Sequence, residues 1–336
     1  MGGIRDMVLA AGISFGTAVL LGGLLTPLFK KLSFAQGERP EGPKSHLKKA
    51  GTPSLGGVIL LGALVPGVLL AAGEGLAAAL PCLLVTVAFG LVGFVDDSMK
   101  IRRKSAQGLP VWQKVLLQFA LSLGAALYLF FSGQVGPVVG LPLSGGIWNM
   151  GVLYIPFAVL VLMGTVNGVN LTDGLDGLAA GISVMTELSY GVLFCLMAAA
   201  ADLSTWGARA AGQEGMAAFC GAAAGSCLGF LLFNSYPARI FMGDTGSLAL
   251  GGALAMGALT SGQALLLPLM GVGYVVSVVT VILQVGSWKL RGKRIFKMAP
   301  LHHHFELCGV PEPKITAMYL IFTAAACLFG LLLYLL

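Results

Sequence analysis

The sequence predicts an all-α polytopic membrane protein, one integral membrane domain over residues 1–336, with about ten transmembrane helices and both termini outside. Hydrophobic residues make up 57% of the chain and charged residues only 10%, whereas soluble domains carry about 25% charged residues. The mean hydropathy is +0.90. The apolar runs are long and do not alternate, which is typical of helices that satisfy their own backbone hydrogen bonds inside lipid.

Ten apolar runs approach the length of about 20 residues that a spanning helix needs. They cover 7–29, 55–73, 76–95, 115–132, 149–167, 177–200, 215–233, 247–260, 265–288 and 315–335. No basic start of a cleavable signal precedes the first run, so we expect that run to stay in the membrane. A weak break, Thr260 to Gln263, separates the eighth run from the ninth.

The basic residues give the orientation of these runs. Of the 20 lysines and arginines, 18 lie in four loops that fall on one side, 30–54, 96–114, 234–246 and 289–314, and the four histidines lie there too. Lysine and arginine mark the cytoplasmic side of a membrane protein. Ten spans with these loops inside place both termini outside.

The first chemical motif is the pair Asp96 and Asp97, at the end of the third run. Adjacent carboxylates at a helix C-terminus face the negative end of the helix dipole and repel each other. A cation must compensate them, either a divalent metal or the basic residues that follow, of which Lys100 comes first. The alternative is a solvated helix end at the membrane boundary.

The second motif is N-L-T-D-G-L-D-G, Asn170 to Gly177, which opens the sixth run. Asp173 and Asp176 are three residues apart, so both can lie on one helix face. They can instead cap the helix, with Asp173 at the N-cap and Asp176 in the manner of a capping box. Gly174 and Gly177 allow a ligand to approach the backbone closely, so the segment can do both jobs.

The third motif, Asn234 to Ser247, contains Asp244 in the sequence G-D-T-G-S just before the eighth run. Asp244 can cap this helix or serve as a hard oxygen ligand for Mg²⁺.

The fourth motif is A-P-L-H-H-H-F-E, Ala299 to Glu306. Three consecutive histidines cannot all face one way, and the lysines and arginine before them favour an anion-binding surface. Zinc-like spacing of histidine and cysteine is absent from the motif.

The fifth motif, His46 to Gly57, enters the second run. Lys49, Thr52 and Ser54 are candidate phosphate contacts, although positive-inside anchoring explains the lysine equally well. All five motifs lie at one membrane depth and mix acids with bases. That combination suits a phosphate-rich substrate, with a metal on carboxylates and cations on the remaining charge.

Together the five motifs resemble the polyprenyl-phosphate N-acetylhexosamine-1-phosphate transferase superfamily, from about Pro43 to the end of the chain. Within it the chain is most similar to the phospho-N-acetylmuramoyl-pentapeptide transferases, because H-H-H-F-E differs from the histidine pattern of the N-acetylglucosamine enzymes. Ser54, and Ser98 after the aspartate pair, depart from the commoner residues, but neither change removes a charge.

The resemblance implies a reaction in which UDP-MurNAc-pentapeptide and undecaprenyl phosphate give lipid I and UMP, a step of peptidoglycan synthesis. It also implies Mg²⁺ as cofactor, a homodimer, no nucleic-acid partner, and a multi-pass place in the bacterial cytoplasmic (inner) membrane with the site on the cytoplasmic face. A transferase for UDP-N-acetylglucosamine is the alternative. A membrane transporter is a second, but charge at span ends on one face argues against it.

The resemblance also implies roles for individual residues. The catalytic set is Asp96, Asp97, Lys114, Asn170, Asp173, Asp244 and His303, with Asp244 and Asp173 as metal ligands. The substrate-binding set is Lys49, Thr52, Ser54, Gly174, Leu175, Asp176, Asn234, Phe241, Gln284, His302 and His304. The sequence leaves open which aspartate acts as base, and whether transfer is direct or passes through an aspartyl phosphate. Both routes require the aspartates to converge.

Overall fold

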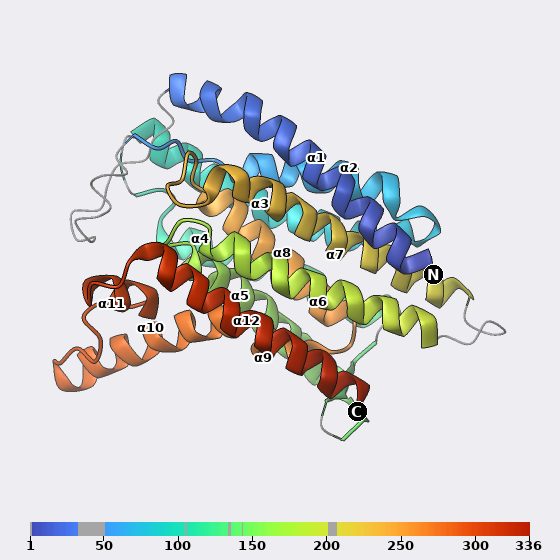
Figure 1. Ribbon diagram of the computed structural model, residues 1–336. Coiled ribbons are helices and arrows are strands. Elements are labelled where there is room, and N and C mark those ends of the chain that lie inside the picture. The colour runs from blue at the N-terminus through green and yellow to red at the C-terminus, as the bar shows by residue number, and fades with distance from the viewer. Residues whose placement is uncertain are drawn as a thin grey trace.

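A computed structural model of the chain describes residues 2–32, 51–103, 105, 107–133, 136–142, 144–200 and 207–336. Lys49, one of the predicted phosphate contacts, lies outside these residues. The described chain is almost entirely helical, and its long helices lie side by side as a bundle (Figure 1).

Ten helices correspond in order to the ten predicted runs. They are α1 (Gly2–Lys31), α2 (Gly57–Ala71), α3 (Leu76–Arg103), α4 (Val111–Phe131), α5 (Tyr154–Thr172), α6 (Leu178–Ala200), α7 (Gly207–Asn234), α8 (Gly243–Thr260), α10 (Val272–Arg291) and α12 (Glu312–Leu335). Two short helices, α9 (Leu267–Met270) and α11 (Leu301–Leu307), precede and follow α10. Short 3₁₀ turns fall at Gly73–Gly75, Gly151–Leu153 and Ala264–Leu266.

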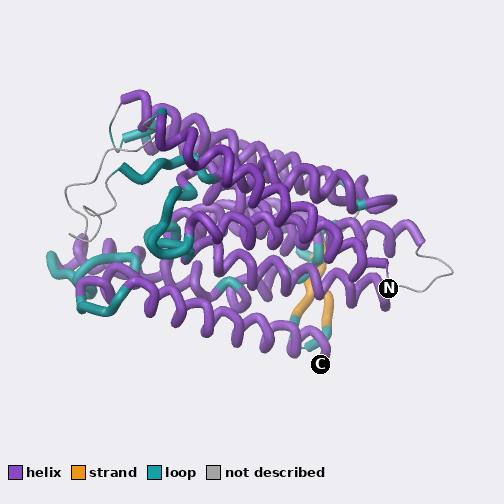
Figure 2. Tube along the Cα trace, turned by 45° about the horizontal axis from the view of Figure 1, so that its top comes forward, coloured by secondary structure: helices purple, strands orange, loops and turns teal. Residues whose placement is uncertain are grey.

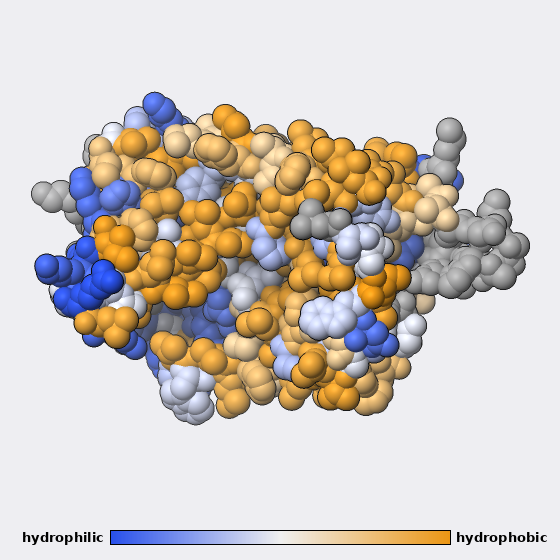
Figure 3. Space-filling model, turned by 90° about the horizontal axis from the view of Figure 1, so that it is seen from below, coloured by the Kyte–Doolittle hydropathy of each residue, from blue (hydrophilic) through white to orange (hydrophobic). Residues whose placement is uncertain are grey.

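Length and hydropathy agree with a membrane protein. Within the described ranges, eight helices are long and apolar enough to cross a bilayer, and α2 is a shorter apolar helix. The remaining member of the ten, α8, has 18 residues and begins with polar ones. Apolar side chains cover most of the face in Figure 3, and the strongly hydrophilic ones gather mainly at the end where α11 lies. The chain is therefore an all-α, multi-pass membrane protein.

Helix α8 occupies the centre of the bundle. Every residue from Thr245 to Leu259 is buried, as expected for a helix that is apolar on all sides. Glycines let neighbouring helices approach it closely. A Cβ at Gly93 of α3 would overlap the carbonyl oxygen of Asp244, and one at Gly57 of α2 would overlap the nitrogen of Gly246. These approaches fix the N-terminus of α8 against α2 and α3.

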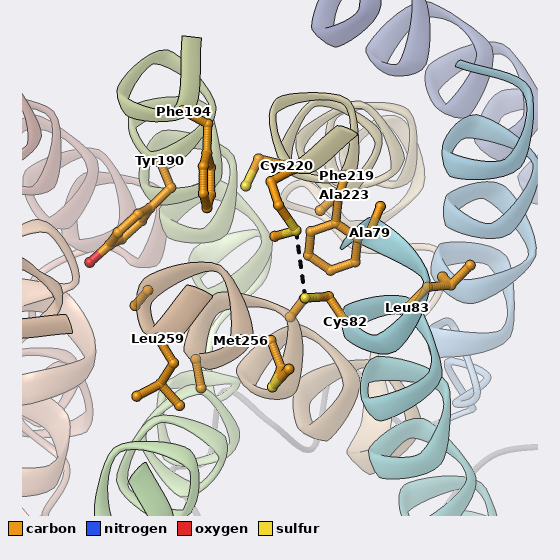
Figure 4. Packing of buried hydrophobic residues seen from close by; sticks show 14 of the residues in the cluster. Ala79, Cys82, Leu83, Tyr190, Phe194, Phe219, Cys220, Ala223, Met256 and Leu259 are labelled. Carbon is orange, nitrogen blue, oxygen red and sulfur yellow. Dashed lines mark hydrogen bonds between the residues drawn. The ribbon is translucent and has the colours of Figure 1, made fainter. Parts of the chain in front are cut away.

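The core between α3, α6, α7 and α8 is packed with aromatic, small and sulfur-containing side chains (Figure 4). Cys82 of α3 and Cys220 of α7 are fully buried there as free thiols. The Cys82 thiol lies 3.6 Å from the sulfur of Met216. These cysteines serve as small core residues.

An antiparallel hairpin, which the hydrophobic pattern does not predict, joins α4 to α5. Strand β1 (Val138–Leu141) pairs with β2 (Gly146–Asn149), and Gly140 donates a backbone hydrogen bond of 2.8 Å to the carbonyl oxygen of Gly262. The hairpin lies near the C-terminus, at the end of the bundle away from α11 (Figure 2). It is remote from the predicted chemistry.

Candidate active site

The site begins with an acidic pair inside a helix. The sequence predicts that the third span ends at residue 95, but α3 continues to Arg103. Asp96 and Asp97 therefore lie within its last two turns, and they are only 2% and 0% exposed. The alternative of a solvated helix end is wrong for this pair. Because residues three and four positions apart face each other on a helix, Lys100 reaches both carboxylates.

Asp244, at the start of α8, links this pair on α3 to helices α4 and α5. Its Oδ2 atom lies 2.9 Å from Nζ of Lys100 on α3 and 2.5 Å from Nζ of Lys114 on α4. Its Oδ1 atom accepts a hydrogen bond of 2.8 Å from Asn170 on α5, which also donates to Ser247 at 2.9 Å. The carboxylate at the start of α8 is thus held by groups from α3, α4 and α5.

Asp97 caps α8 from outside that helix. Its Oδ1 atom accepts from the backbone nitrogen of Asp244 at 3.1 Å, and its Oδ2 atom accepts from the nitrogen and hydroxyl of Thr245 at 2.8 and 2.7 Å. First-turn N–H groups have no acceptor within their own helix, and a carboxylate there is also favoured by the helix dipole. Gly243, at φ +71°, has no room for a side chain, because a Cβ would lie 2.6 Å from Asp97.

The three carboxylates form a group that can hold a metal ion. Asp96, Asp97 and Asp244 each offer an oxygen, and these atoms lie within 4.8 Å of one another. Carboxylate oxygens are the donors that Mg²⁺ and Ca²⁺ prefer. When ionised, the three acids exceed the two ammonium groups of Lys100 and Lys114 by one negative charge. The donor set therefore fits a hard divalent cation.

Asp173 lies beside this trio and is not part of it. It follows α5 as its C-cap, while α6 begins only at Leu178, so its interpretation as the N-cap of the sixth span is wrong. Desolvation raises the pKa of Asp173 to about 8, and the carboxylates of Asp244 and Asp97 act in the same direction. The carboxylates of the trio therefore act on Asp173 electrostatically. The resemblance implies that Asp173 is a metal ligand, and this stays a prediction.

The segment after Asp173 is tied to two other parts of the chain. The nitrogen of Asp176 donates to Glu312 Oε1 on α12 at 2.6 Å, and its carboxylate accepts from the nitrogen of Ala238 at 2.9 Å. Asn234 accepts from the nitrogen of Gly177 at 3.2 Å and donates to the carbonyl of Ile240 at 3.0 Å. Asp176 and Asn234 therefore fix loops that border the trio.

The histidines of α11 divide as the sequence suggests. His302 and His303 face the Gly174 backbone, where a Cβ would lie 2.5 Å from one imidazole and 2.9 Å from the other. His303 Nδ1 lies 3.2 Å from Glu306 Oε2. His304 points elsewhere, because its Nδ1 atom accepts from the nitrogen of Lys297 at 3.1 Å.

The remaining predicted contacts lie on segments around the same end of the bundle. Ser54 is buried, next to Gly243 and Asp97. Phe241 pairs through its backbone with Pro53 and Gly56, at 2.8 Å in each bond. Thr52 precedes this pairing, and Leu175 is buried in the segment before α6.

The side chain of Gln284 forms hydrogen bonds to the backbone of the loop after α10. Its amide oxygen accepts from the nitrogens of Ile295 and Phe296, each at 3.0 Å, and its amide nitrogen donates to the carbonyl of Phe296 at 2.9 Å. It therefore holds the loop after α10.

Two residues of the site were not named as site residues from the sequence. Lys100 contacts all three carboxylates of the trio, and its spacing of three and four residues from the aspartates was the available signal. Glu312 supports the segment around Asp176 from α12, at the far end of the sequence. No local pattern signals that second contact, because it depends on how α12 packs.

Comparison of the sequence with known proteins places this chain in a family. Residues 79–262 match glycosyl transferase family 4, a range that contains the trio and both lysines. The chain is 45% identical over 321 residues to the phospho-N-acetylmuramoyl-pentapeptide-transferase of Clostridium perfringens strain 13, covering 96% of each protein. It is 42% identical over 330 residues to the enzyme of that name from Heliobacterium modesticaldum, covering 98% of each. The Clostridium novyi enzyme of that name is 41% identical over 326 residues, which is 97% of this chain and 96% of that protein. The chain therefore belongs to glycosyl transferase family 4 and, within it, to the phospho-N-acetylmuramoyl-pentapeptide-transferases.

Proposed function

We propose that this protein transfers phospho-MurNAc-pentapeptide from UDP-MurNAc-pentapeptide to undecaprenyl phosphate, giving lipid I and UMP for peptidoglycan synthesis. The observation that carries the proposal is the trio of Asp96, Asp97 and Asp244, which contacts Lys100 and Lys114 at one end of a membrane bundle. The near full-length similarity to relatives of that name supports the donor and the acceptor. The reaction would take place at the cytoplasmic face of a bacterial cytoplasmic membrane.

We infer that the trio holds Mg²⁺, with Asp244 as a principal ligand and Asp173 close by. The ion would neutralise charge on the diphosphate as a Lewis acid. Lys114 is placed to compensate the remaining phosphate charge, because its Nζ already lies at Asp244. Asn170 orients the Asp244 carboxylate through the other oxygen.

We propose direct transfer as the mechanism. An oxygen of the lipid phosphate would form a bond to the sugar-bearing phosphorus, and the bond from that phosphorus to UMP would break. A phosphate monoester has a second pKa of about 6, so the acceptor is already mostly ionised at neutral pH. Both oxygens of Asp97 already accept hydrogen bonds from the start of α8, which disfavours it as a nucleophile. Isolation of a phosphorylated aspartate in the absence of the lipid acceptor would overturn direct transfer.

We propose that the other predicted residues form the donor site in two ways. The uridine, phosphates and sugar would be contacted by Lys49, Thr52, Ser54, Gly174, Leu175, His302 and His303. His304, which accepts from the nitrogen of Lys297, would flank this site. Asp176, Asn234, Phe241 and Gln284 would shape it, since their observed hydrogen bonds hold the surrounding loops.

The defining experiment measures UMP release by membranes that contain the protein. UMP is expected from UDP-MurNAc-pentapeptide only when both undecaprenyl phosphate and Mg²⁺ are present. UDP-N-acetylglucosamine serves as the competing donor, and equal or faster UMP release from it would assign the protein to the alternative transferase reaction. Cross-linking in native membranes tests the proposed homodimer separately.

A further inference from the structure

One side chain already occupies the point that the three carboxylates share. Nζ of Lys100 lies 2.6 Å from Asp96, 3.5 Å from Asp97 and 2.9 Å from Asp244. Lys100 is only 8% exposed, so its ammonium group is enclosed by the site. Lys114 forms an ion pair with Asp244 and reaches it from α4.

The trio needs a compensating cation when no metal is bound. Buried carboxylates this close repel one another, and an uncompensated buried charge is strongly destabilising. Two of these carboxylates belong to α3 and the third to α8, so the repulsion would act across the junction at which Asp97 caps α8. The Lys100 ammonium removes that repulsion.

The same position makes Lys100 a competitor of a divalent ion. A cation that shares the oxygens of the trio must lie within reach of all three, and the ammonium already does. Two cations at adjacent positions repel each other at short range, more strongly in a buried site than in water. One of them must therefore give up oxygens to the other.

We propose that Lys100 is a built-in substitute for the divalent cation, an ammonium that holds the trio together in the metal-free protein and competes with the ion for the same oxygens. This inference rests on the metal site of the proposed function. Lys100 is then a positioning residue that keeps the α3–α8 junction assembled without metal and weakens metal binding so that it stays reversible.

The test follows the thermal stability of the purified full-length protein in detergent as Mg²⁺ is titrated after removal of divalent ions by EDTA. In Lys100→Met, the melting temperature without Mg²⁺ is expected to fall by about 5 °C or more. Added Mg²⁺ should restore most of the loss, and the Mg²⁺ concentration at half-maximal stabilisation should fall about tenfold relative to the unmodified protein.

Two variants serve as controls. Arg102→Met removes a cation from the same helical turn, but Arg102 is exposed and outside the trio. This variant should leave the melting temperature without Mg²⁺ and the Mg²⁺ midpoint unchanged. Lys100→Arg keeps the charge and should keep the Mg²⁺ midpoint of the unmodified protein. An arginine variant that behaved like Lys100→Met would mean that packing rather than charge is responsible, which would overturn the inference.

The remaining outcomes are also decisive. An unchanged Mg²⁺ midpoint in Lys100→Met would overturn the inference, and so would a Lys100→Met protein that Mg²⁺ cannot restore to the folded state. Neither result would affect the proposed function, which depends on UMP release by the unmodified protein. Failure of that release, with the midpoint shifted as expected, would instead leave a metal-binding membrane protein of another activity.

Discussion

At the scale of single residues, Asp244 and Asp97 have different tasks although both belong to the trio. Asp244 receives its contacts from side chains, namely Asn170, Lys100 and Lys114. Asp97 receives most of its contacts from the backbone and hydroxyl at the start of α8. Removing the charge of Asp244 should therefore lower the transfer activity. Removing the carboxylate of Asp97 should lower the stability of the fold.

Asp244→Asn is expected to lower Mg²⁺-dependent UMP release by about 100-fold or more, because a neutral amide is a poor ligand for a hard cation. The fold should survive, since an amide oxygen can still accept from Asn170. Asp6→Asn, at the other end of the bundle, is the matched control and should retain activity. Full activity of Asp244→Asn at ordinary Mg²⁺ would remove Asp244 from the metal site.

Asp97→Ala is expected to destabilise the protein more than Asp244→Ala does. Loss of an N-cap costs about 0.5–2 kcal/mol, and here the alanine would also leave Lys100 with one fewer buried partner. Thermal unfolding in detergent, with both variants in parallel, measures the difference. A larger loss in Asp244→Ala would contradict the capping role of Asp97.

At the scale of elements, the order of the ten helices that match the predicted runs follows from the sequence, but their ends do not. Hydropathy predicts an end of the third span at residue 95, whereas α3 continues to Arg103 because Asp96 and Asp97 form buried ion pairs with Lys100 on the same helix. A hydropathy scale scores each of these residues as unfavourable in a membrane-spanning helix. It cannot detect an ion pair that makes burial of the three residues acceptable.

The grouping of the aspartates was predictable only in part. The motifs placed Asp96, Asp97, Asp173 and Asp244 at one membrane depth, and the structure brings three of them into one group. Asp97 rather than Asp173 joins this group because α3 approaches α8 closely, which the absence of a side chain at Gly93 permits. That approach is a property of tertiary packing, so no pattern within either motif reveals it.

The contact between α11 and the segment before α6 gives an element-scale prediction. In Gly174→Ala, the new methyl group would lie 2.5 Å from Nε2 of His302, so the segment or the histidines must shift. We expect UMP release to fall about tenfold or more, because small displacements of positioning groups are costly in transfer reactions. Gly164→Ala in α5 is the control, since nothing lies within 4 Å of its Cβ position, and it should keep full activity. Equal activity of the two variants would show that the α11 contact does not position substrate.

At the scale of the whole molecule, the two termini and α11 lie at opposite ends of the bundle (Figure 1). An even number of spans requires the termini to share one side, and we predict from the basic loops that this side is the exterior. Figure 1 agrees that the termini share an end, and the positive-inside pattern supplies the direction. Cys308, exposed at the end of α11, should then face the cytoplasm.

This orientation can be measured with a membrane-impermeant maleimide. In intact spheroplasts, Cys308 is expected to stay unlabelled, whereas a cysteine at the exposed C-terminal position, Leu336→Cys in a Cys308→Ser background, should be labelled. In inverted vesicles the two results should exchange. The other five cysteines are buried or only partly exposed, so the Cys308→Ser protein without the added cysteine gives the background. Labelling of Cys308 from outside would reverse the orientation and place the trio on the outer face, away from any nucleotide donor made in the cytoplasm.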